Sequence, residues 1–149
     1  MMSRTAPNPK IRKLAQRLVA FDSAVNHPSA ANVPAVFRVV EKLGRPLSTL
    51  AGAAGFRSLL ARSLTLAKVQ EPRLSAVRVK PDGSLEGLSD LGSQDQVAEA
   101  GVVLIAELLG LLVTFIGESL MLSVVLEVWP EFPVMDTEHW RKDHHDATN

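Results

Sequence analysis

The chain has 149 residues, of which 46% are hydrophobic and 21% charged, a composition that fits one folded domain and argues against global disorder. Because cysteine is absent, disulfide scaffolds, iron–sulfur clusters, cysteine-ligated zinc and thiol nucleophiles are excluded. The formal net charge is zero, yet residues 1–80 hold 14 basic and 3 acidic side chains, whereas residues 81–149 hold 2 basic and 13 acidic ones. The two halves therefore carry opposite net charges of +11 and −11.

The N-terminal region predicts a flexible arm followed by a basic amphipathic helix. Pro7 and Pro9 disfavour a helix over residues 1–9, and residues 1–20 lack the apolar run expected of a secretory signal peptide. Apolar residues recur at helical spacing over residues 10–22. The outer side of this helix carries a basic patch of four residues, which are Lys10, Arg12, Lys13 and Arg17. We expect a connector over residues 23–33.

Glycine and proline residues divide the next region into two predicted helices, over residues 34–43 and 47–69. Gly44 suits a C-terminal cap for the first of them, and Pro46 suits the first turn of the second. Gly52 and Gly55 are unfavourable inside a helix, so they mark a candidate break.

Residues 74–88 predict a β-hairpin. Val77 and Val79 favour a strand, and the following Lys-Pro-Asp-Gly sequence supplies a tight turn, because proline fixes φ and glycine accepts a positive φ. Two isolated strands are only marginally stable in water, so we expect the hairpin to pack on a helix or to pair with another chain.

A long apolar helix is predicted over residues 96–129. A straight helix of this length would span about 50 Å, but a globule of this size is only about 40 Å across. We therefore expect the helix to bend at Gly101, Gly110 or Gly117, or to project into a partner. Residues 130–149 contain two prolines and clustered charges and predict a loosely ordered tail.

The long helix is apolar over about two-thirds of its circumference, more than a surface helix needs. It predicts either the centre of a bundle, an interface between chains, or a segment in lipid. Residues 102–128 are long enough to span a bilayer, although two glutamates make insertion marginal. The candidate interface residues are Leu108, Leu112, Phe115, Ile116 and Leu120.

Glu107 and Glu118 lie eleven residues apart and return to the same face of that helix. Their separation of about 16 Å along the axis is too large for both to act on one bond. We therefore expect structural ion pairs, with Arg57 and Arg62 as the nearest cations and Arg57 bonded to one of the two glutamates.

Motifs for catalysis and cofactor binding are missing from the sequence. The nucleophile elbow, the phosphate-binding loop, the dinucleotide fingerprint and the HExxH zinc motif do not occur. We expect no catalytic residue, no cofactor and no metal site, and we interpret the histidines near the C-terminus as part of a solvated tail.

These features together predict a mainly α-helical fold, with about four helices around the long C-terminal helix and one hairpin. The expected function is a non-enzymatic, cytoplasmic regulatory protein that binds a protein partner or a second copy of itself. Two alternatives stay open at this point. The segment 102–128 can place the protein in a membrane, and the basic N-terminal helix can bind nucleic acid, which the neutral overall charge disfavours.

Overall fold

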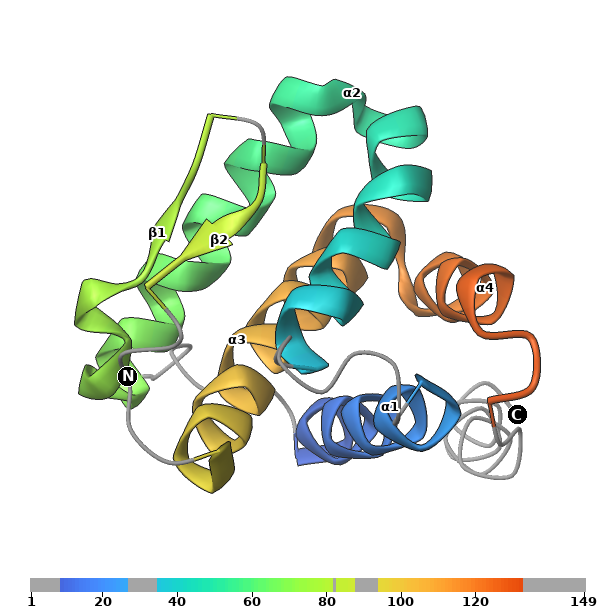
Figure 1. Ribbon diagram of the computed structural model, residues 1–149. Coiled ribbons are helices and arrows are strands. Elements are labelled where there is room, and N and C mark those ends of the chain that lie inside the picture. Colours follow the sequence, from blue (N-terminus) through green and yellow to red (C-terminus); the bar gives the residue numbers. More distant parts are fainter. Residues whose placement is uncertain (1–8, 27–34, 82, 88–93, 133–149) are drawn as a thin grey trace.

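A computed structural model describes residues 9–26, 35–81, 83–87 and 94–132 of the chain. Four helices and one two-stranded hairpin form a small bundle, which confirms the predicted fold class (Figure 1). The elements in chain order are α1 (Pro9–Asn26), α2 (Ala35–Gln70), the short 3-10 helix η1 (Pro72–Ala76), β1 (Arg78–Val79), β2 (Leu85–Glu86), α3 (Gln94–Ile116) and α4 (Glu118–Val128).

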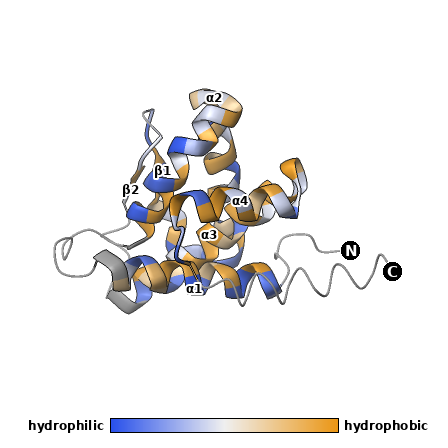
Figure 2. Ribbon diagram, turned by 90° about the vertical axis from the view of Figure 1, so that its right-hand side faces the viewer, coloured by the Kyte–Doolittle hydropathy of each residue, from blue (hydrophilic) through white to orange (hydrophobic). Residues whose placement is uncertain are grey.

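Helix α3 is the centre of the bundle. It packs against α1, α2 and α4, and most side chains between Val103 and Leu109 are buried. Figure 2 shows α3 in the middle of the molecule with mainly hydrophobic residues along it. The excess of apolar surface on this helix is thus largely covered by the chain's own helices.

Helix α2 does not end at Gly44, and the prediction of separate helices on either side of Pro46 is wrong. Val36, Val40 and Leu47 are buried on one continuous face that runs past both residues. Pro46 removes one hydrogen bond from the helix, at a cost of about 3 kcal/mol. Burial of this apolar face against α1 and α3 outweighs that cost.

Both long helical segments break at a glycine instead. Gly52, with φ 83° and ψ 160°, divides α2 into a first arm, residues 35–51, and a second arm, residues 53–70. Gly117, with φ 88° and ψ 159°, separates α3 from α4. This backbone region is essentially restricted to glycine. A Cβ at either position would meet no atom within 4 Å, so backbone conformation and not crowding requires glycine there. Two of the predicted bend positions are therefore confirmed.

The hairpin is present but shorter than the predicted 74–88. Its strands are antiparallel, with Arg78 opposite Glu86 and Val79 opposite Leu85. Residues 74–76 belong to the 3-10 helix η1. The hairpin packs on the second arm of α2, as a pair of short strands requires (Figure 1).

The chain remains packed for a few residues beyond α4. Trp129 and Phe132 are both buried, and the Phe132 ring lies edge-on to Phe21, with 5.6 Å between ring centroids. Packing against α1 therefore includes Phe132, which follows the predicted helix end at residue 129. The predicted arm before Pro9 and the tail after Phe132 lie outside the described residues.

Candidate functional site

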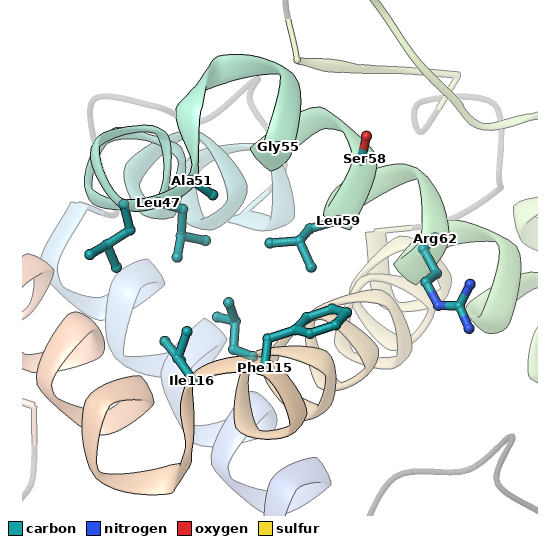
Figure 3. Close-up of a pocket in the computed structure, with 10 residues that line it drawn as sticks. Leu47, Ala51, Gly55, Ser58, Leu59, Arg62, Phe115 and Ile116 are labelled. Atoms are coloured by element: carbon teal, nitrogen blue, oxygen red, sulfur yellow. The ribbon is translucent and has the colours of Figure 1, made fainter.

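The bend of α2 creates an apolar pocket, here called the elbow pocket. Its volume is about 340 Å³, and it lies between the two arms of α2 and the C-terminal end of α3 (Figure 3). The first arm of α2 contributes Leu47, Leu50 and Ala51 to the lining. The second arm contributes Gly55, Ser58, Leu59 and Arg62. Helix α3 contributes Leu112, Phe115 and Ile116. The volume falls within the range that small-molecule sites occupy.

The polar groups of the elbow pocket lie at its edge. Figure 3 shows the Ser58 hydroxyl directed away from the cavity, and the Arg62 guanidinium beyond the Phe115 ring. Arg62 is the charged residue in the lining. A bound molecule would therefore meet aliphatic and aromatic groups inside the pocket and one cation at its mouth.

Large apolar side chains are exposed around this pocket. Leu50 is 54% exposed and Phe115 is 62% exposed, although they come from different helices. Leu120, in the first turn of α4 after the break at Gly117, is 42% exposed. We call Leu50, Phe115 and Ile116, which line the pocket, the elbow patch; Leu120 is not among the lining residues.

The five residues expected at an interface divide into two groups. Leu108 is fully buried in the core and does not lie on the surface of this chain. Leu112 is buried as well and lines the elbow pocket. The other three, Phe115, Ile116 and Leu120, reach the surface. The helix is covered along its middle, and its large apolar side chains become accessible near the break at Gly117.

Arg57 and Glu107, which were expected as candidates for an ion pair, each bond to another residue. Arg57 Nη1 donates a hydrogen bond to the carbonyl oxygen of Pro81 at 3.0 Å, which joins α2 to the hairpin. The buried Glu107 carboxylate accepts a hydrogen bond from Gln70 Nε2. Arg62 lies exposed at the elbow pocket. Glu118 lies half-buried in the first turn of α4, where a carboxylate suits the positive end of the helix.

Asp22 forms a buried polar cluster that the sequence reasoning missed. Its carboxylate, fully buried, accepts hydrogen bonds from Arg38 Nε at 2.9 Å, Lys42 Nζ at 2.6 Å and Trp129 Nε1 at 3.1 Å. The Lys42 ammonium also lies 6.0 Å from the centroid of the Trp129 ring. We call Asp22, Arg38, Lys42 and Trp129 the Asp22 clasp, because it joins α1, α2 and the end of α4.

The two buried carboxylates respond to their surroundings in opposite ways. Burial by itself raises the pKa of Asp22, but hydrogen bonds from Lys42, Trp129 and Arg38 and the charge of Lys42 outweigh burial, so this pKa is lowered. Burial raises the pKa of Glu107, and the single hydrogen bond from Gln70 opposes it only in part. The Asp22 clasp thus favours the charged carboxylate, whereas the site of Glu107 favours the neutral acid.

The four members of the predicted basic patch, Lys10, Arg12, Lys13 and Arg17, are all exposed on the outer side of α1. This helix packs against α2 and α3 through its opposite face. The patch lies on a different helix from those that form the elbow pocket.

Helix α3 also has the length and composition of a membrane-spanning helix. Over Gln96–Ile116 it is long and apolar enough to cross a bilayer, and 56% of its most apolar window is buried inside the chain. Burial of this kind is expected of a core helix, since a helix in lipid exposes its apolar surface.

Within the described residues, no group of three or more histidine, aspartate or glutamate side chains lies close enough together to hold a metal ion. The residues that line the elbow pocket are mostly apolar, and Ser58 and Arg62 are the polar ones. Comparison with known protein families, with curated proteins and with solved structures gave no match for this chain.

Proposed function

We propose that this chain is a non-enzymatic interaction protein of the cytoplasm that acts through protein–protein contact at the elbow patch, with a second copy of itself as partner. One observation carries this proposal. Leu50 and Phe115 come from different helices, yet both remain exposed at the mouth of the same apolar pocket. Large apolar side chains that converge in this way are typical of contact surfaces.

The charges beside the elbow patch favour a second copy as the partner. Helix α2 carries six cations and the single acid Glu41, whereas α3 and α4 carry acids and no cation. The patch lies where these elements meet. In a two-fold dimer the same surface is used by both copies, so α2 of one copy can face α3 and α4 of the other. Apolar contact and opposite charge would then support the same arrangement.

Sedimentation equilibrium of the full chain with and without Phe115→Ser tests the proposal. We expect wild type to self-associate, and the variant to weaken association at least about tenfold, because covering a phenylalanine contributes about 1.5 kcal/mol or more. Val69→Ser is the matched control, since Val69 is 63% exposed but does not line the elbow pocket. A wild type that stays monomeric at all concentrations, or an equal effect of the control, would overturn the proposal.

Membrane association is the second candidate, and the apolar length of α3 is the observation that favours it. It requires α3 to leave its packing against α1 and α2. The same sample separates the two candidates. A chain that is monomeric in buffer but sediments with anionic lipid vesicles favours the membrane.

A further inference from the structure

We propose that the elbow pocket binds a straight-chain monocarboxylate of medium length, with its alkyl chain between the arms of α2 and its carboxylate at Arg62. This inference goes beyond self-association and depends on the pocket alone. A bound chain would fill the space beneath the elbow patch, so the two proposals do not exclude each other.

The interior of the pocket fits an alkyl chain. Its walls consist of leucine, isoleucine, alanine and phenylalanine side chains that approach from three sides (Figure 3). A cavity of about 340 Å³ holds roughly ten groups the size of a water molecule or a methylene, at about 30 Å³ each. A chain of about eight to ten carbons therefore matches the available space.

The orientation of such a chain follows from where the polar groups lie. Inside the pocket a carboxylate would lose its hydration and find no donor, because the Ser58 hydroxyl is directed away. At the mouth, Arg62 offers a planar guanidinium that suits a carboxylate. Among the described residues, the salt bridges of the chain do not include Arg62.

The surrounding charge selects an anion over a neutral or cationic head group. Residues 42–70, which include both α2 walls of the pocket, contain five cations and no acid, and the lining residues from α3 are uncharged, so the charge that borders the pocket on its α2 side is positive. A cationic amphiphile with the same alkyl chain would meet repulsion at the mouth, and an alcohol would lose the charge-assisted hydrogen bond.

Isothermal titration of the full chain with hexanoate, octanoate, octan-1-ol and octyltrimethylammonium tests the inference. We expect octanoate to bind most tightly, and we expect each added methylene to tighten the Kd about three- to fourfold. Arg62→Gln should weaken octanoate binding about tenfold and change octan-1-ol binding less than about twofold. Arg45→Gln is the matched control, because Arg45 is an exposed cation on α2 that does not line the elbow pocket.

A second variant locates the alkyl chain. Ala51 lines the elbow pocket and is exposed, so Ala51→Phe should fill the cavity and abolish binding of both octanoate and octan-1-ol while the thermal unfolding midpoint is retained. Absence of octanoate binding, equal affinity for octanoate and octan-1-ol, or equal loss in both arginine variants would overturn the inference. The test of self-association uses another variant, Phe115→Ser, and another measurement, sedimentation. A chain that does not bind octanoate would therefore leave the proposal of self-association untouched.

Discussion

The first arm of α2 connects a buried polar cluster at one end of the molecule with an open apolar pocket at the other. At one end, Arg38 and Lys42 bind the fully buried Asp22 carboxylate, and Trp129 completes its hydrogen bonds. At the other end, Leu47 and Leu50 line an open apolar pocket. The Asp22 clasp buries polar groups with their partners in place, whereas the elbow patch leaves apolar groups in water. The first arrangement stabilises the fold, and the second costs stability unless something covers it.

We expect the largest loss of stability from a substitution in the Asp22 clasp. Asp22→Ala removes the carboxylate that two cations share, so we expect a loss of about 3 kcal/mol in the free energy of unfolding, measured by urea denaturation. The expected loss is at the lower end of the range for buried pairs, because both cations reach solvent in part. Glu127→Ala, an exposed acid on α4, should change stability by less than about 0.5 kcal/mol. Equal effects of the two variants would remove the contrast between the clasp and an ordinary surface charge.

At the elbow, the backbone is the sensitive feature. Gly52→Ala places a Cβ at φ 83°, so we expect a cost of about 1–3 kcal/mol although no atom crowds the position. The bend would also open, and binding of octanoate would fall with it. Ala53→Ser, at the exposed neighbouring position, should stay within about 0.5 kcal/mol of wild type. A fully stable Gly52→Ala chain with unchanged binding would show that the bend does not shape the pocket.

Lowering the pH should change the free energy of unfolding by a smaller amount, and Asp22 and Glu107 should contribute with opposite signs. Because the pKa of Asp22 is lowered in the folded state, the stability that its charge contributes is fully present above the unfolded-state pKa of about 3.9. This stability is lost as the pH falls through the lower pKa of the folded state. The raised pKa of Glu107 means that its charged form opposes folding at neutral pH, and this cost disappears as pH falls through the raised value.

Glu107→Gln keeps an acceptor for Gln70 and removes the buried charge. We expect it to stabilise the chain at pH 7 by on the order of 1 kcal/mol and to have no such effect near pH 3, measured by thermal unfolding at both pH values. Destabilisation at pH 7 would mean that the Glu107 charge has a partner that outweighs its burial.

Much of the fold follows from local pattern. Helical spacing and the turn sequence predict the helices and the hairpin. A straight helix of about 50 Å does not fit a globule of about 40 Å, so a bend is expected at Gly101, Gly110 or Gly117, and the structure has it at Gly117. Local rules fail at Gly44 and Pro46, because one buried face continues through them and tertiary packing outweighs propensity.

The sites were less accessible from sequence. Asp22 and Trp129 bond across 107 positions, and no local rule joins them. One signal was nevertheless present, since Asp22 is the single acid in the first 40 residues of a basic half. Spacing along a helix placed Glu107 and Glu118 on one face but did not show which residues they meet, and Arg57 consequently received the wrong partner. The elbow pocket depends on the angle between the arms of α2, which sequence does not give.

We propose that the elbow end, and not the Asp22 clasp, is the contact surface of this protein. Sedimentation equilibrium of wild type and Phe115→Ser at low and high salt tests it most directly. We expect wild type to associate, Phe115→Ser to weaken association at least about tenfold, and high salt to weaken it further, because opposite charges flank the patch. A monomeric wild type, or association that Phe115→Ser leaves unchanged, would contradict the claim.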